Sequence, residues 1–124
     1  MAGSIVFVRQ GDVPGQNVYY QEYLMTADAA AGTFPTTSSM PINGKILSVV
    51  TKPGATQPQA AYDITLSDSD GANVMGTTLN DRAAAAAEKV VPAVPPYVIG
   101  PLSIAVANNN VNSAVVTLKI IIER

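Results

Sequence analysis

One acidic segment has the residue types of a calcium-binding loop. The segment Asp68–Asn73 carries several oxygen-bearing side chains, and hard cations prefer oxygen ligands. The EF-hand pattern requires an oxygen ligand at the fifth position, glycine at the sixth and glutamate at the twelfth, where this sequence has Ala72, Asn73 and Leu79. An Asp-Gly turn over Asp68–Gly71 is therefore the favoured interpretation. We predict no metal site and no cofactor.

Two pairs of adjacent opposite charges could act as an acid and a base. They are Asp81 with Arg82 and Glu88 with Lys89. General acid–base catalysis depends most often on histidine, and this sequence contains neither histidine nor cysteine. Ser-His-Asp triads, thiol nucleophiles, disulfides and metal sites of the Cys/His type are thereby excluded. We expect ion pairs at these positions, and we expect the protein not to be an enzyme.

Three tyrosines lie close together in the predicted strand Val18–Thr26. As flat apolar rings with hydroxyl groups, they could stack against a sugar or contact a receptor. Strand alternation places Tyr19 and Tyr23 on one face with Met25, and Tyr20 on the other. Packing in the core or in a subunit interface is favoured, because such rings bury a large area.

Two segments have too little core of their own to be ordered alone. They are Ser4–Arg9 and the small-residue loop Ala27–Pro41, and we expect both to reach neighbouring subunits. The large side chains of these two segments, together with the three tyrosines, are the candidate interface residues. They are Ile5, Phe7, Tyr19, Tyr20, Tyr23 and Phe34.

The composition points to a protein that contacts other proteins. Hydrophobic residues make up 48% of the 124 residues and charged residues only 13%, about half of the ~25% that is usual. A formal net charge of −2 gives little attraction for a phosphate backbone, so we do not expect nucleic acid as a partner. The N-terminal residues lack the pattern of a secretion signal, and no apolar stretch approaches the ~20 residues of a membrane span. We expect synthesis in the cytoplasm and no membrane partner.

Short alternating segments separated by Gly, Pro, Asn and Ser predict an all-β chain. We expect a single-domain antiparallel β-sandwich or jelly roll over residues 1–124, with about seven short strands and at most one short helix. Residues 1–43 are expected to contribute an arm and a long surface loop. The expected strands are Ser4–Arg9, Val18–Thr26, Lys45–Lys52, Tyr62–Ser67, a return arm at Asn73–Met75, and a hairpin of Val98–Ala107 with Ala114–Ile122.

The apolar patterns within these elements predict which side chains face the core. Tyr62, Ile64 and Leu66 alternate cleanly and should point inward. The strand Lys45–Lys52 is apolar on both faces, with Ile46 and Val50 on one and Leu47 and Val49 on the other. In the hairpin, Leu102, Ile104, Leu118 and Ile120 should lie in the core. Residues 78–89 are the helix candidate, and Val90–Pro96 should be an extended connector because of its prolines.

The chain from about residue 41 onward resembles small virion proteins of tailed bacteriophages and prophages. The matching motifs are Pro41-Ile42-Asn43-Gly44, Val50-Thr51-Lys52-Pro53-Gly54, Tyr62-Asp63-Ile64-Thr65-Leu66, Asp68-Ser69-Asp70-Gly71, Asn80-Asp81-Arg82 and Gly100-Pro101-Leu102. The resemblance implies a head protein of the cement or decoration kind that clamps capsid subunits, and it transfers no catalytic residue.

From these patterns and the resemblance we expect a structural protein on the capsid surface of the virion. It would form a homo-oligomer, a trimer or a dimer, and bind the major capsid protein. The alternative is a β-module of a tail or fibre that binds a host-surface glycan or receptor through the tyrosines.

Overall fold

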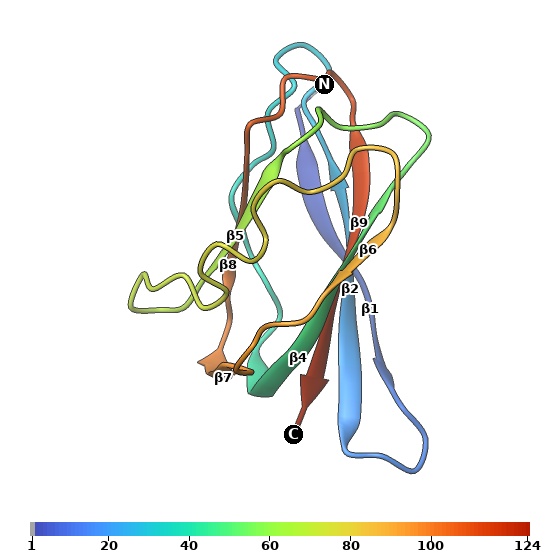
Figure 1. The fold of residues 1–124 in the computed structure, drawn as a ribbon. Coiled ribbons are helices and arrows are strands. Elements are labelled where there is room, and N and C mark those ends of the chain that lie inside the picture. Colours follow the sequence, from blue (N-terminus) through green and yellow to red (C-terminus); the bar gives the residue numbers. More distant parts are fainter. Residues whose placement is uncertain (1) are drawn as a thin grey trace.

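The chain folds into two facing β-sheets (Figure 1). The computed structural model describes residues 2–124, which form nine strands and no helix. All strand pairs are antiparallel. The strands are β1 (Ser4–Asp12), β2 (Val18–Thr26), β3 (Thr37–Ser38), β4 (Ile42–Pro53), β5 (Asp63–Ser67), β6 (Glu88–Val90), β7 (Tyr97–Gly100), β8 (Ser103–Ala107) and β9 (Val115–Glu123). The predicted all-β sandwich is confirmed.

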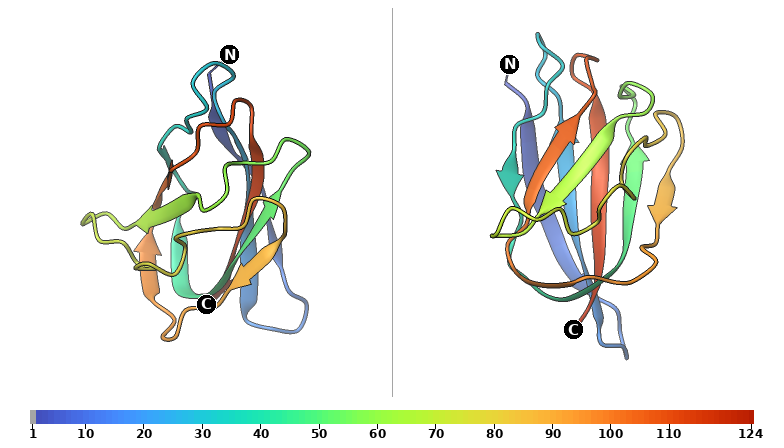
Figure 2. Two further views of the ribbon diagram at one scale, coloured as in Figure 1. Left: turned by 45° about the horizontal axis from the view of Figure 1, so that its top comes forward. Right: turned by 60° about the vertical axis from the view of Figure 1, so that its left-hand side comes forward.

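Sheet A is the larger sheet and sheet B covers one of its faces. Sheet A has the order β1-β2-β9-β4-β6, with β7 paired to another part of β4, and sheet B has the order β3-β8-β5. Figure 2 shows β5 and β8 lying across sheet A. The core fills the space between the sheets and includes the fully buried side chains Tyr23, Met25, Ile46, Tyr62, Ile64, Leu66, Leu102, Ile104, Leu118 and Ile120. The other face of sheet A carries no covering layer within the described chain, and we call it the open face.

Two predicted strands have the expected form. The observed bounds of β2 are those predicted, and on β5 the alternation places Ile64 and Leu66 in the core, with Tyr62 just before the strand. The first strand is longer than predicted, because β1 runs to Asp12 and pairs with β2 from Ser4 onward. The segment expected as an arm is thus an edge strand of sheet A.

The faces predicted for β4 were wrong because the strand contains a bulge. The register with β9 shifts between Ile46 and Ser48, so Leu47 is an extra residue on the β4 side. An extra residue reverses the alternation beyond it. Ile46 and Val49 are therefore both fully buried. Leu47 and Val50 are half-buried and do not belong to the core.

The predicted hairpin between Val98 and Ile122 was also wrong. β8 pairs with β3 and β5 in sheet B, whereas β9 lies between β2 and β4 in sheet A. Residues 108–114 cross from one sheet to the other, and Gly100, with φ of 98°, is the last residue of β7 before the chain enters β8. The predicted core side chains Leu102, Ile104, Leu118 and Ile120 are nevertheless all fully buried, because each arm presents its apolar face to the same core from opposite sheets.

The predicted helix over residues 78–89 is absent. This part of the chain forms turns and a bridge before β6 begins at Glu88. Asp81 has φ of 58°, which interrupts a right-handed helix, and the alanine run alone is too short to nucleate one. Likewise, Asn73–Met75 is not a strand: a single bridge joins Asn73 to Ser67. Within residues 2–124 no helix is long and apolar enough to cross a membrane.

The long loop Ala27–Pro41, expected to reach neighbouring subunits, contributes to the core of its own chain. Ala27 and Phe34 are buried in the same cluster as the strand residues, and Ser39 is buried as well. Gly32, with φ of 70°, lies against the backbone of Asn110. The loop is therefore anchored within its own chain at several points.

Candidate interaction surfaces

Two of the four charged side chains considered for catalysis, Arg82 and Glu88, contact each other. Glu88 Oε1 accepts a hydrogen bond of 2.7 Å from the backbone N–H of Ala83 and lies 3.5 Å from Arg82 Nη1. Asp68 Oδ1 accepts hydrogen bonds from the N–H groups of Asp70 and Ala72, which confirms the predicted turn. Within residues 2–124 no cluster of three or more acidic side chains is arranged to hold a metal ion.

The structure separates the six candidate interface residues into core and surface positions. Ile5, Tyr19, Tyr23 and Phe34 are buried in the core of this chain, whereas Phe7 is exposed and Tyr20 is half-buried on the open face. The alternation predicted for the tyrosines is correct, because sheet B covers the face that Tyr19 and Tyr23 share. Phe7 and Tyr20 are thus the members of this set that a partner could reach.

A buried polar network joins β2 to the chain before β4. The Tyr23 hydroxyl donates a 2.7 Å hydrogen bond to Gln21 Oε1 and accepts one of 2.8 Å from the N–H of Met40. Gln21 Nε2 donates to the carbonyl of Pro41 over 3.1 Å. Burial raises the pKa of Tyr23, so its hydroxyl stays protonated and able to donate.

A second buried tyrosine is not hydrogen-bonded in this way. Within residues 2–124, neither the hydroxyl of Tyr62 nor that of Thr51 has a partner with hydrogen-bond geometry. Burial raises the pKa of Tyr62, and the neighbouring Thr51 hydroxyl offsets only part of this rise. Removal of the Tyr23 hydroxyl would therefore leave buried polar groups without hydrogen-bond partners, whereas removal of the Tyr62 hydroxyl would not.

The same substitution is expected to have opposite consequences at these two tyrosines. Tyr23→Phe leaves a buried amide oxygen and a backbone N–H without partners, so it should lower the free energy of unfolding by about 1–3 kcal/mol. Tyr62→Phe removes a polar atom that has no partner and should be neutral or stabilising. Urea unfolding of both variants tests this difference. Equal losses of stability in the two variants would contradict the expected difference between the two hydroxyls.

One exposed apolar surface lies at the β1 edge of sheet A. We call it the β1 surface, and it consists of Val6, Phe7, Val8 and Leu24, all exposed; Val6 and Leu24 lie on the open face, whereas Phe7 lies on the inner face beside Tyr23. The β1 strand is the last strand of sheet A on this side, so one row of its backbone N–H and C=O groups faces outward. Long apolar edge strands readily pair with other chains. This edge can therefore accept a partner strand.

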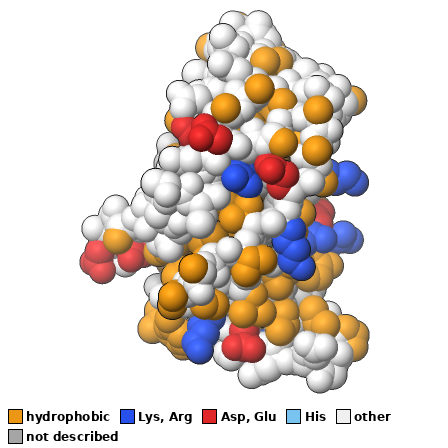
Figure 3. Space-filling model, in the orientation of Figure 1, with side chains coloured by type: hydrophobic (Ala, Val, Ile, Leu, Met, Phe, Trp, Pro, Cys, Tyr) orange, Lys and Arg blue, Asp and Glu red, His pale blue; other side chains and the backbone are white. Residues whose placement is uncertain are grey.

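A second exposed apolar surface lies at the opposite edge of sheet A, on the segment that joins β6 to β7 and on β7 itself. We call it the β7 surface, formed by Val91, Val94, Tyr97 and Ile99. Val94 and Ile99 are 81% and 73% exposed, although such side chains are usually buried. In Figure 3 hydrophobic side chains gather at the lower end of the molecule, where Figure 1 places β7.

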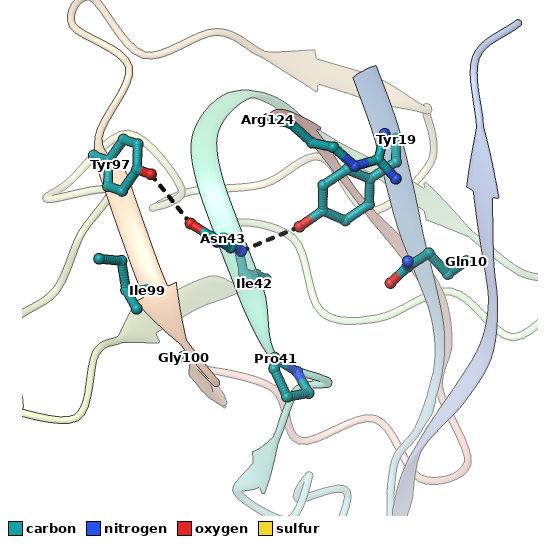
Figure 4. A pocket seen from close by; sticks show the side chains of 9 residues that line it. All are labelled: Gln10, Tyr19, Pro41, Ile42, Asn43, Tyr97, Ile99, Gly100 and Arg124. Carbon is teal, nitrogen blue, oxygen red and sulfur yellow. Dashed lines mark hydrogen bonds between the residues drawn. The ribbon is translucent and has the colours of Figure 1, made fainter. Parts of the chain in front are cut away.

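A hollow of about 510 Å³ borders the β7 surface. Figure 4 shows how its side chains lie around β4. Tyr97 Oη donates to Asn43 Oδ1 over 3.1 Å, and the N–H of Asn43 donates to Tyr19 Oη over 3.2 Å. The Arg124 guanidinium lies 4.5 Å from the centre of the Tyr19 ring. The hollow thus combines aromatic faces with amide and guanidinium groups.

Sequence reasoning missed the β7 surface. It treated Val90–Pro96 as a connector and assigned residues after Val98 to a hairpin arm. Pro92, Pro95 and Pro96 could have indicated an exposed apolar segment, because prolines prevent a segment from joining the interior of a sheet. Apolar residues between such prolines do not take part in strand pairing, and so strand pairing does not bury them in the core.

The fold places this chain in the class of antiparallel two-sheet β-sandwiches. No protein-family model, curated protein or solved structure matches it. Many unrelated functions occur on sandwich folds, so function must be argued from the surfaces.

Proposed function

We propose that this protein is a structural virion protein, a cement or decoration protein on the capsid of a tailed bacteriophage. The observation that carries the proposal is the pair of apolar surfaces at opposite edges of sheet A. A protein that bridges two neighbours needs two separate contact surfaces, and each must exclude water from apolar side chains. The resemblance of residues 41–124 to small phage virion proteins supports the viral assignment.

The proposal includes self-association into a dimer or trimer that binds the major capsid protein, and no enzymatic activity. The outward edge of β1 supports self-association, because two such edges can satisfy each other's backbone groups. The two surfaces differ in sequence and position, so one can serve contacts between copies while the other contacts the capsid.

Removal of the protein is expected to weaken filled heads. A protein that binds only the assembled lattice stabilises it by mass action, by about 2.7 kcal/mol per site at a hundredfold excess over the dissociation constant. Heads without it should release DNA at a lower temperature, measured by dye fluorescence during heating, while adsorption to cells is unchanged. Unchanged heat resistance with lost adsorption would contradict the proposal.

Purified variants added back to these heads test whether both surfaces are needed. Val6→Asp on the β1 surface and Ile99→Asp on the β7 surface should each fail to restore heat resistance, because a bridge requires both contacts. Gln16→Asp, on an exposed turn, introduces the same charge and should restore it fully. Circular dichroism confirms that each variant is folded.

The second candidate is a tail or fibre module that binds a host-surface glycan. The hollow beside β7 favours it, because Tyr97 offers an exposed aromatic ring and Asn43 and Arg124 offer polar groups, which is a composition suited to a small-ligand site. Localisation at the tail of purified particles, with loss of adsorption in Tyr97→Ala, would favour this candidate over the capsid role.

A further inference from the structure

The open face of sheet A concentrates positive charge. A row of paired residues crosses five strands in the order Arg9, Glu22, Lys119, Val50 and Lys89, and Lys52 lies two residues beyond Val50 on β4. These side chains point away from the core, because their neighbours along each strand, such as Leu118, Ile120 and Thr51, are fully buried. In Figure 3 several Lys and Arg side chains gather on the right, where Figure 1 places sheet A.

A bulge in β1 brings the arginine into this row. The register with β2 shifts between Phe7 and Arg9, so Val8 is the extra residue. Without the extra residue, Arg9 would share the inner face of Phe7. With it, Arg9 Nη2 lies 3.3 Å from Glu22 Oε1, and both Arg9 and Lys119 contact the face of the Tyr20 ring.

The row is only partly neutralised within the chain. Glu22 contacts both Arg9 and Lys119, the latter at 3.8 Å. On the other side of Lys119, Val50 separates it from Lys89, roughly 10 Å away at the usual strand spacing. With Lys52, the four cations and Glu22 carry a net charge of +3, in a chain whose formal net charge is −2.

The centre of the open face is hollowed. A depression of about 310 Å³ is lined by Arg9, Glu22, Val50, Lys52, Thr117 and Lys119. The adjacent row of paired residues is Val6, Leu24, Thr117 and Lys52, and Val6 and Leu24 belong to the exposed β1 surface. The depression therefore offers ammonium groups, a hydroxyl and apolar side chains side by side.

We propose that the open face of sheet A binds an acidic segment of a partner protein, whose carboxylates pair with Lys52, Lys89 and Lys119. Charge complementarity identifies the partner: its carboxylates balance the positive charge that Glu22 leaves unneutralised on this face, and the segment's apolar residues cover Val6 and Leu24. The proposal gives the chemistry of a partner of the β1 surface, and it does not require that partner to be a capsid protein.

A protein partner fits this face better than a nucleic acid. A polynucleotide carries a phosphate at every step of its backbone, and Glu22 in the middle of the row would repel it. The overall net charge of −2 gives no long-range attraction for a polyanion. A peptide with spaced carboxylates can place them at the lysines, while Glu22 stays in its ion pair with Arg9.

Binding of a fluorescein-labelled peptide of alternating glutamate and threonine tests this proposal. Fluorescence anisotropy should show binding at about 0.01 M ionic strength that weakens at about 0.15 M, since screening shortens from roughly 30 Å to 8 Å. The same peptide with glutamine in place of glutamate should not bind. An oligothymidylate of equal charge should bind more weakly than the glutamate peptide.

Charge reversals at matched positions test where the peptide binds. Lys52→Glu and Lys89→Glu, both at exposed lysines, should each weaken binding at least about tenfold, because an attraction becomes a repulsion. Lys45→Glu makes the same charge change roughly 20 Å away along β4. It should leave the affinity within about twofold at 0.1 M ionic strength, where screening acts over ~10 Å.

Four results would overturn the proposal. They are absence of peptide binding even at low ionic strength, equal binding of the glutamine peptide, tighter binding of the oligothymidylate, and equal weakening by Lys45→Glu and Lys52→Glu. None of them bears on the heat resistance of particles, so this proposal and the proposed function fail independently.

Discussion

Replacement of Leu118 by alanine is expected to lower the free energy of unfolding by about 2–5 kcal/mol. Leu118 is fully buried on β9, the central strand of sheet A, between Tyr23 on β2 and Thr51 on β4. Its truncation removes buried methyl groups and leaves a cavity that a sheet flanked on both sides cannot close. The loss is a large part of the 5–15 kcal/mol that stabilises a typical domain.

Thr117→Ala is the matched control for this change. Thr117 is the preceding residue of β9 and points to the open face, so its truncation should change stability by about 0.5 kcal/mol or less. Urea unfolding followed by tyrosine fluorescence gives both values. Similar midpoints for Leu118→Ala and the wild-type protein would contradict the placement of Leu118 in the core.

Gly44→Ala is expected to lower the free energy of unfolding by about 2 kcal/mol or more. Gly44 has φ of 155°, and a Cβ atom there would lie 2.2 Å from the carbonyl oxygen of Glu123 on β9. Neither backbone can move away freely, because β4 is paired with β9 on one side and with β7 on the other. The same shift would displace Asn43, whose hydrogen bonds hold Tyr97 and Tyr19 beside the hollow.

Gly71→Ala separates backbone strain from this steric clash. Gly71 has φ of 84° but no atom within 4 Å of the position of a Cβ, so its substitution should cost only the strain of left-handed backbone, about 1 kcal/mol. Thermal melts of the two variants provide the comparison. An equal or larger loss in Gly71→Ala would show that Gly44 has room for a side chain.

Alternation in the sequence predicted which side chains enter the core better than it predicted which strands pair. Ile104 and Leu118 were both assigned correctly to the core, yet they lie on different sheets. A period of two reports that one face is buried and carries no information about the neighbouring strand. The asparagine-rich link between them is compatible with a hairpin turn and with a crossing, so pairing could not be deduced locally.

A bulge caused the wrong prediction of which β4 side chains face the core, because the extra residue Leu47 reverses the alternation within that strand. A second extra residue, Val8, reverses the alternation within β1. Neither position carries the Gly or Pro that would mark an irregularity in the sequence. For the same reason the cationic row on the open face could not be foreseen, because a regular β1 strand would turn Arg9 inward.

The position of β9 has a consequence for how the protein folds as it is synthesised. β9 is the last strand in sequence but lies between β2 and β4 at the centre of sheet A. A nascent chain that ends at β8 can form the β1–β2 hairpin and pair β4 with β6 and β7, but these two halves of sheet A have no strand to join them. Most pairings connect distant parts of the chain, a topology that folds on a scale of milliseconds to seconds. Cooperative folding therefore waits for residues 115–123, and until then the apolar edges of β2 and β4 stay open to chaperones or to pairing with another nascent chain.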